Sequence, residues 1–238
     1  MSSVNTTDRT PVVKITDLSF RWPNAKEDIL QIPSLVIEQG EHIFIKGPSG
    51  CGKSTLLGLL TGINQAQSGS VEILGCDING LKPSERDKFR ADNIGYIFQQ
   101  FNLLPYLSVV ENVLLPCQFS ALRKQQLTSS PQETAVQLLE RLHLPLEYLS
   151  KSVSELSIGQ QQRVAAARAL MGAPKLIIAD EPTSALDHDN RTAFIELLME
   201  QANQLNSTLV FVSHDPTLEA QFDRSINLKE INLAGVPS

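Results

Sequence analysis

The segment Gly47–Ser54, which reads GPSGCGKS, constrains the fold of this chain more than any other part of the sequence. The apolar run Glu41–Lys46 before it is typical of a buried strand, and Ser54–Leu60 after it is typical of the start of a helix. Glycines allow backbone angles that are closed to other residues, so the N–H groups of the loop and the helix N-terminus can surround a phosphate. This context disfavours the alternative, a Gly/Ser turn with an incidental lysine.

The loop therefore predicts a nucleotide site in which individual side chains have separate tasks. Lys53 would reach the β- and γ-phosphates, and the hydroxyl of Ser54 would be a ligand of Mg²⁺. The nucleotide-binding residues that we expect in this region are Gly47, Pro48, Ser49, Gly50, Cys51, Gly52, Lys53, Ser54 and Thr55.

A second apolar run, Leu176–Ala179, is followed by two adjacent carboxylates, Asp180 and Glu181. P-loop proteins use an acidic residue at the end of such a strand to hold Mg²⁺, and this is the role we predict for Asp180. Glu181 is then placed to orient or deprotonate an attacking water. The alternative, in which one carboxylate only caps the helix after Pro182, is weaker because a phosphate loop precedes it in the chain.

His214 follows a third apolar run that begins at Phe211. Ligands of α/β proteins bind along the carboxyl edge of the sheet, so a histidine at the end of a predicted core strand is a candidate for the site. The remaining histidines lack this context. We expect them in a strand, at a helix end and on the surface, in the order His42, His143 and His188.

Between the phosphate loop and the carboxylates, Leu156–Gln160 reads LSIGQ. Together with the other two motifs, and in this order, it resembles the signature of the ATPase subunits of ABC (ATP-binding cassette) systems, and the resemblance extends over almost the whole chain. It implies an α/β fold, a P-loop NTPase with a RecA-like core, an N-terminal antiparallel β-subdomain and an inserted α-helical subdomain. It also implies ATP and Mg²⁺ as ligands and ATP hydrolysis as the reaction.

The same resemblance assigns roles to residues outside the phosphate loop. It implies that Trp22 stacks on adenine, although this residue could also be a core residue of an edge strand. Gln99, directly after an aromatic residue, resembles the glutamine that contacts Mg²⁺ and the water, and Gln100 is the neighbouring candidate. His214 resembles the switch histidine, and Asp187 belongs to a segment that resembles the loop crossing between two subunits.

The signature residues Ser157, Gly159 and Gln160 are implied to face the γ-phosphate of a nucleotide bound to a second copy of the chain. The commonest form of this signature has glycine where this chain has Ile158. The serine hydroxyl, the backbone and the dipole of the helix expected to begin at Gln160 all survive this change, so we expect the closed dimer to form.

Composition excludes several classes of protein. The net charge of −6 and the pI of about 5.3 argue against a nucleic-acid-binding protein, and no cluster of Lys and Arg counters this. No apolar run reaches the roughly 18 residues that cross a bilayer, and Met1–Thr10 lacks the layout of a signal peptide. Cys51, Cys76 and Cys117 form no close pair, so neither zinc nor a disulfide framework is expected. We therefore expect a soluble, cytosolic chain.

A chain of 238 residues can bury one good core, or one domain with a subdomain, and we expect a single domain over residues 1–238. Around the phosphate loop, strands are expected at Val12–Phe20, Ile29–Glu38 and Val71–Leu74. Residues from about 101 to 165 change to a helical pattern interrupted by prolines, and we expect them to form the inserted subdomain. This region includes an amphipathic helix that starts near Pro131, with its apolar positions at Ala135, Leu138, Leu139 and Leu142.

A chain of this family without a membrane segment needs partners. The resemblance implies a homodimer with each ATP between two copies, and a separately encoded permease that holds the ATPase at the cytoplasmic face of the membrane. The segment Phe101–Val113 is either ordinary core of the helical subdomain or an apolar surface that receives a short helix of the permease. Its sequence, with the signature, is similar to ATPases of the lipoprotein-releasing and macrolide-efflux group.

Two other classes compete with the transporter subunit. The first is an ABC ATPase without transport, either a signalling subunit of a transmembrane complex of the cell-division type or a soluble assembly factor for iron–sulfur clusters. Co-purification with an integral membrane protein would separate the assembly factor from the others. The second is a DNA-repair, chromosome or ribosome-associated ABC protein, which is disfavoured because long coiled coils, zinc modules and a second cassette are missing from the sequence.

Overall fold

The computed structural model describes residues 10–184 and 188–235. Its centre is a five-stranded parallel sheet with the order β6-β7-β8-β3-β9. The central strands are short apolar runs, as expected for a parallel sheet that is covered on both faces. The strands are β3 (His42–Lys46), β6 (Ile94–Ile97), β7 (Leu176–Asp180), β8 (Thr208–Val212) and β9 (Arg224–Asn227).

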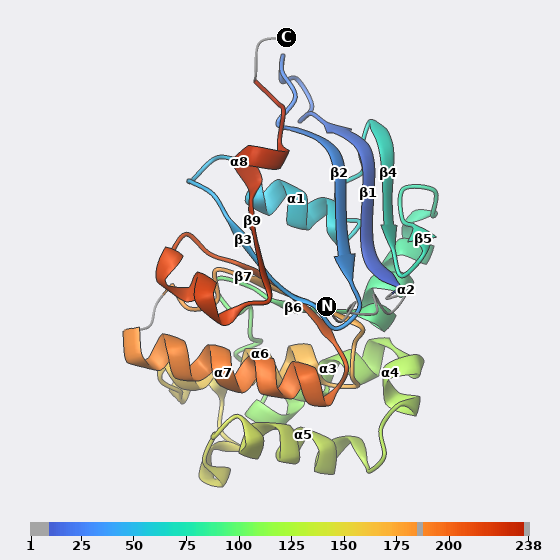
Figure 1. Ribbon diagram of the computed structural model, residues 1–238. Coiled ribbons are helices and arrows are strands. Elements are labelled where there is room, and N and C mark those ends of the chain that lie inside the picture. Colours follow the sequence, from blue (N-terminus) through green and yellow to red (C-terminus); the bar gives the residue numbers. More distant parts are fainter. Residues whose placement is uncertain (1–9, 185–187, 236–238) are drawn as a thin grey trace, which may run out of the picture.

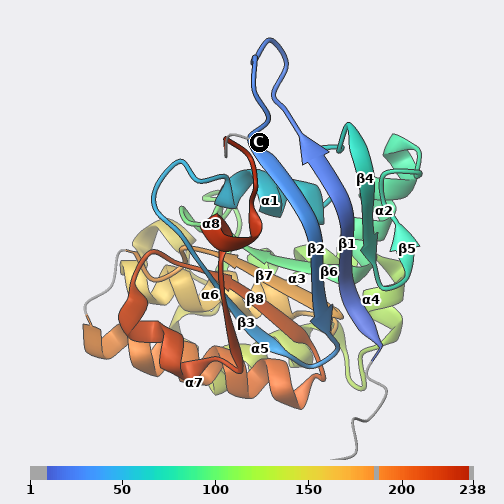
Figure 2. The ribbon, with the colours of Figure 1, turned by 45° about the horizontal axis from the view of Figure 1, so that its top comes forward.

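A second sheet is antiparallel, has four strands and follows the order β2-β1-β4-β5. Figure 2 shows three of its strands, β2, β1 and β4, side by side. The predicted strands near residues 12–20, 29–38 and 71–74 are confirmed, although the third begins three residues earlier, at Ser68. The strands are β1 (Pro11–Phe20), β2 (Leu30–Glu38), β4 (Ser68–Ile73) and β5 (Cys76–Asp77).

The sheets and helices form layers. Figure 1 shows α1 (Lys53–Leu60) between the antiparallel sheet and the parallel sheet, with helices such as α5 and α7 beyond the parallel sheet. One apolar core joins both sheets to α1, and a second joins the parallel sheet to the helices beyond it. Strand β3 serves both cores, because Ile43 and Ile45 pack in the first and Phe44 packs in the second. The phosphate loop therefore starts from a strand that is held on both sides. These layers confirm the predicted P-loop NTPase fold.

The described elements between β6 and β7 are all helical. Several of these helices begin at a serine N-cap followed three residues later by Glu or Gln, a reciprocal capping box. The amphipathic helix predicted near Pro131 is confirmed as α5, which buries its apolar face. The remaining helices are α2 (Pro83–Asn93), α3 (Val109–Phe119), α4 (Ala121–Gln125), α5 (Pro131–Arg141), α6 (Ile158–Leu170), α7 (His188–Gln204) and α8 (Leu228–Ile231), with 3-10 turns at Leu146–Tyr148, Val153–Glu155 and Pro216–Gln221.

Helix α6 differs from the sequence-based expectation at its start. It begins at Ile158 rather than at Gln160, because Ser157 is its N-cap and accepts a hydrogen bond from the N–H of Gln160 at 3.3 Å. The helix continues to Leu170, so the predicted end of the inserted subdomain, at about residue 165, falls inside this helix. The limits of the inserted subdomain and the single-domain organisation stay predictions.

Helix α6 also packs directly against β6. A Cβ atom at Gly95 in β6 would lie 2.2 Å from the carbonyl oxygen of Ala169 in α6, so only glycine permits this approach. The helix that carries the LSIGQ segment and the strand that leads to Gln99 are therefore in backbone contact.

The segment Phe101–Val113 is not one continuous surface. Phe101, Val109 and Val113 belong to the second apolar core, as expected if the segment is ordinary core of the helical subdomain. Tyr106 is 78% exposed, and the leucines of the segment are half-buried. The segment thus combines core and surface positions, because its irregular backbone turns successive side chains in different directions.

Candidate active site

The phosphate loop connects β3 to α1 and presents its backbone to a ligand. Gly52 has a φ of 100° and is the N-cap of α1, and a Cβ atom there would lie 2.7 Å from Leu30. No side chain in the described part of the chain caps α1, so its first N–H groups can bind an anion. The amine of Lys53 donates to the carbonyl oxygens of Gly47 and Pro48, at 2.7 and 3.1 Å. This backbone cradle fits the phosphates of a nucleotide.

A cleft of about 430 Å³ opens at this loop. Its walls come from the end of the β1–β2 hairpin, the loop and first turn of α1, the segment after β6, and the end of β7. Residues that are far apart in the sequence and were predicted from separate motifs meet here. The cleft is lined by Trp22, Ile29, Ser49, Gly50, Gly52, Lys53, Ser54, Thr55, Gln99, Asp180 and Glu181.

Trp22 stands at the hairpin side of the cleft. Its side chain is 47% exposed, and its ring meets that of Phe20 edge to face, with the ring centroids 5.1 Å apart. A tryptophan with this exposure is not a core residue of the edge strand, which was the alternative interpretation. An exposed aromatic ring beside a phosphate cradle is suited to stack on a nucleotide base.

Asp180 and Glu181 lie where β7 ends, at the same cleft. Glu181 has a φ of 45°, which residues other than glycine rarely adopt, and its N–H donates to the carbonyl of Val212 at 2.9 Å. Its Oε1 lies 4.0 Å from Nζ of Lys53. Burial, and then the charge of Glu181, raise the pKa of Asp180. Two adjacent carboxylates, one of them desolvated, fit a divalent cation, because a cation would relieve their repulsion.

The imidazole of His214 meets the same carboxylate. Its Nδ1 lies 3.3 Å from Oε2 of Glu181. The contact follows from the sheet order, because β7 and β8 are neighbours and both residues follow the carboxyl ends of these strands. Glu181 therefore lies between an amine and an imidazole, an arrangement that can align a water molecule and take up its proton.

The signature residues lie elsewhere. Ser157, Gly159 and Gln160 form the start of α6, and they do not line the cleft of their own chain. The side chain of Gln160 accepts a hydrogen bond from the N–H of Ser157 at 2.9 Å, which closes the capping box. Ile158 is 52% exposed. Asp187, predicted to contact a second subunit, lies outside the described residues.

Two residues near the site were not predicted from the sequence. Ile29 lines the cleft because the hairpin brings it beside Phe20, whose carbonyl accepts a hydrogen bond from its N–H at 2.9 Å. The hydroxyl of Tyr96 donates to Oδ2 of Asp180 at 3.5 Å. Strand pairing places Tyr96 opposite Ile178, on the same side of the sheet as Asp180. The sequence places Tyr96 three residues before Gln99, which was a signal that it lies near the site. Its contact with Asp180 could not be predicted without knowing that β6 pairs with β7.

Comparison with known proteins agrees with this geometry. The family model for ABC transporters matches residues 30–184, more than half of the chain. The chain belongs to the ABC transporter family. It is 40% identical to the ABC transporter ATP-binding protein YknY of Bacillus subtilis (strain 168), and the match covers 95% of this chain and 97% of YknY. It is 37% identical to the lipoprotein-releasing system ATP-binding protein LolD of Shewanella sp. (strain MR-4), with 94% of this chain and 95% of that one covered.

A third relative is larger than this chain. The macrolide export ATP-binding/permease protein MacB of Burkholderia pseudomallei (strain 1710b) is 37% identical over 94% of this chain, but the match covers only 34% of MacB. The predicted similarity of this ABC ATP-binding subunit to the lipoprotein-releasing and macrolide-efflux group is confirmed by these relatives.

Solved structures support the same assignment. The dimeric structure of MJ0796, a bacterial ABC transporter cassette, matches with a TM-score of 0.79 and 35% identity, covering 90% of this chain and 93% of that one. A dimeric post-hydrolysis state of the same cassette, bound to ADP and Pi, matches with a TM-score of 0.79 and 34% identity over the same shares of the two chains. Within residues 10–184 and 188–235 of this protein, no helix has the length and apolar character needed to cross a bilayer.

Cys51 gives a test of the loop by chemical modification. Its half-buried side chain lines a neighbouring pocket together with Asp28, Gly50 and Lys229. A bulky thiol reagent on Cys51 is expected to displace the loop and to block ATP binding, and bound Mg-ATP should protect the thiol. Cys51→Ser should keep wild-type activity and lose the sensitivity, which an ATPase assay before and after treatment measures.

The other two cysteines are the controls for this experiment. Burial raises the pKa of the Cys117 thiol, which makes it less reactive, and Cys76 is half-buried in β5. If Cys51→Ser were still inhibited by the reagent, one of these two thiols would be the target instead.

Proposed function

We propose that this chain hydrolyses ATP and thereby powers a separate membrane permease. The observation that carries the proposal is that the phosphate loop, Asp180 and Glu181 meet in one cleft, where Glu181 also contacts Lys53 and His214. Lys53 holds the β- and γ-phosphates, and Glu181 orients or deprotonates the attacking water, assisted by His214. Trp22 stacks on the adenine.

When bound with the nucleotide, Mg²⁺ would neutralise the charge that develops on the phosphates. The residues that would hold it are Ser54, Gln99 and Asp180, which all line the cleft. Their oxygen atoms are the ligand type that Mg²⁺ prefers, and the partly buried carboxylate of Asp180 adds negative charge close to them.

The active unit is a head-to-tail homodimer. The start of α6 has exposed residues and is separate from the cleft of its own chain, so a second copy is needed to bring a signature to the nucleotide. The uncapped anion site at α1 and the helix start at Ser157 then lie on opposite sides of one ATP. The dimeric form of the similar cassette MJ0796 supports this arrangement. Asp187 is proposed to lie in the loop that crosses between the copies.

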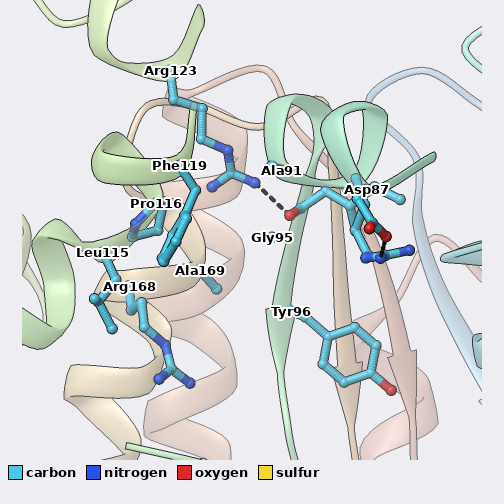
Figure 3. A pocket seen from close by; sticks show the side chains of 12 residues that line it. Asp87, Ala91, Gly95, Tyr96, Leu115, Pro116, Phe119, Arg123, Arg168 and Ala169 are labelled. Carbon is cyan, nitrogen blue, oxygen red and sulfur yellow. Dashed lines mark hydrogen bonds and ion pairs between the residues drawn. The ribbon is translucent and has the colours of Figure 1, made fainter. Parts of the chain in front are cut away.

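The permease binds at a pocket of about 260 Å³ beside the segment that carries Gln99. Figure 3 shows this docking pocket, with Leu115, Pro116 and Phe119 of α3 on one side and Ala91 of α2 on the other. Phe119 is 74% exposed and lines the pocket together with Leu115 and Pro116, and a contiguous apolar surface of this kind marks an interaction site. The occupant that we propose is a short helix of the permease.

The relatives favour transport over the competing functions. In MacB, an ATP-binding region similar to this chain is part of a longer ATP-binding/permease protein, so a permease partner is consistent with this type of cassette. We infer that the chain is one cassette bound to the cytoplasmic face of the membrane, and that a permease encoded separately converts closing and opening of the dimer into transport.

Replacing Phe119 by Glu is expected to abolish co-purification with the permease, because it removes the exposed aromatic ring that the permease helix would cover. Thermal stability and ATP binding of the isolated protein should be unchanged, since the side chain faces solvent. Phe119 is a better position for this test than Leu104 and Leu107 of the predicted docking segment Phe101–Val113, because both leucines are half-buried and their replacement risks unfolding.

Leu146→Glu is the matched control, because Leu146 is also apolar and exposed (54%) but does not line the docking pocket. A pull-down that survives Phe119→Glu in a folded protein would place the docking surface elsewhere. If Leu146→Glu, but not Phe119→Glu, abolished co-purification with the permease, the docking surface would also have to lie elsewhere.

A further inference from the structure

We propose that Arg168 is a positioning residue for hydrolysis, which holds the turn Phe98–Asn102 and with it the side chain of Gln99. The inference rests on the proposed function, because it gives Arg168 a part in the ATPase reaction. Arg168 does not line the cleft, so its effect on the reaction would be indirect.

The turn that carries Gln99 has a backbone conformation that needs external support. Phe101 and Asn102 have φ values of 60° and 49°, so two consecutive residues other than glycine are left-handed. Two backbone hydrogen bonds close the turn, from the N–H of Phe101 to the carbonyl of Phe98 at 2.9 Å, and from that of Asn102 to the carbonyl of Gln100 at 2.7 Å. Conformations of this kind persist only where their surroundings fix them.

Arg168 provides this support. Its guanidinium donates to the carbonyl of Phe101 at 2.5 Å and to that of Asn102 at 2.7 Å. A planar group with two N–H donors fixes both carbonyls relative to each other, which a single flexible amine cannot do. Arg168 is half-buried beside the turn, and this burial lowers the pKa of its guanidinium.

Through Arg168, helix α6 and the docking pocket are both connected to the turn Phe98–Asn102. It lies in the last turn of α6, whose first turn carries the signature residues, and the neighbouring Ala169 touches the strand that leads to Gln99. Arg168 also lines the docking pocket, where Figure 3 shows it next to Leu115. A displacement of α6, or a partner in the pocket, would therefore move the carbonyls that define the turn.

The test is a double-mutant cycle between Arg168→Met and Gln99→Ala. Methionine keeps most of the apolar stem and removes both donors, so kcat should fall about tenfold or more, as expected for the loss of two charge-assisted hydrogen bonds. The KM for Mg-ATP should stay within about twofold, because the phosphate loop is untouched. Combined with Gln99→Ala, Arg168→Met should cause no further loss of kcat, because both variants remove the same function.

Arg163→Met is the matched control. Arg163 lies on the same helix and donates to the carbonyl of Leu142 rather than to the turn, so its loss should leave kcat near the wild-type value. Arg168→Lys retains one charged donor and should restore part of the kcat, and it repeats the cycle if the methionine variant does not fold.

The possible results separate the two proposals. If the wild-type protein does not hydrolyse ATP, the proposed function is wrong and this inference falls with it. If the wild type hydrolyses ATP and the losses from Arg168→Met and Gln99→Ala multiply, Arg168 does not act through Gln99 and only this inference is wrong. An equal loss of kcat in Arg163→Met would also overturn it, because the effect would then belong to the helix as a whole.

Discussion

Replacing Glu181 by Gln is expected to lower kcat for ATP hydrolysis by about 10²- to 10⁴-fold while ATP binding is retained. Glutamine has the same shape but cannot accept a proton from the attacking water. The contacts of the phosphate loop stay intact, because Lys53 is held by two backbone carbonyls and not by Glu181 alone. Single-turnover and steady-state ATPase assays measure the effect.

The same substitution should trap the ATP-bound dimer. If closing of the dimer needs ATP and opening needs hydrolysis, Glu181→Gln with Mg-ATP should elute as a dimer in size-exclusion chromatography, and the wild type should not. Glu147→Gln, at an exposed position outside the cleft, is the control and should behave as the wild type. Turnover of Glu181→Gln within twofold of the wild type would remove Glu181 from the catalytic role.

Local motifs predicted the cleft better than they predicted its surroundings. The phosphate loop, Asp180 and Glu181 could be found because their chemistry needs fixed residue types at fixed spacing, and strand and helix patterns around them are regular. His214 could be found because the carboxyl ends of parallel strands meet at one edge of the sheet. The pairing order that places β8 beside β7 was not available from the sequence, so the contact of His214 with Glu181 came from the structure.

The contacts of Arg168 show why the remainder could not be predicted. An arginine in an Ala-rich helix reads as an ordinary helix former. Its role depends on where α6 crosses β6, and that crossing depends on the missing Cβ at Gly95. The segment Phe101–Val113 posed a similar problem, because left-handed residues interrupt any regular alternation of buried and exposed side chains. Its apolar residues could not be divided into core and surface without the backbone.

The second large effect is expected at the phosphate loop. Replacing Lys53 by Ala should raise the Kd for Mg-ATP by about 10- to 100-fold, the range for losing hydrogen bonds from a charged donor to phosphate. The loop itself also loses support, since the carbonyls of Gly47 and Pro48 no longer receive the amine. Trp22 is the only tryptophan of the chain and lines the cleft, so its fluorescence reports ATP binding without a label.

Lys46→Ala is the matched control for Lys53→Ala, because it removes a lysine from the other end of the same loop. Lys46 forms an ion pair with Glu219 at 2.8 Å on a partly exposed surface and does not line the cleft. A surface pair contributes little, so ATP affinity should change less than about threefold. If Lys53→Ala binds ATP as tightly as Lys46→Ala but turns over slowly, Lys53 aligns the phosphates without contributing to affinity. If both binding and turnover are normal, the phosphate loop is not the nucleotide site, because no other residue of the loop carries a positive charge to the cleft.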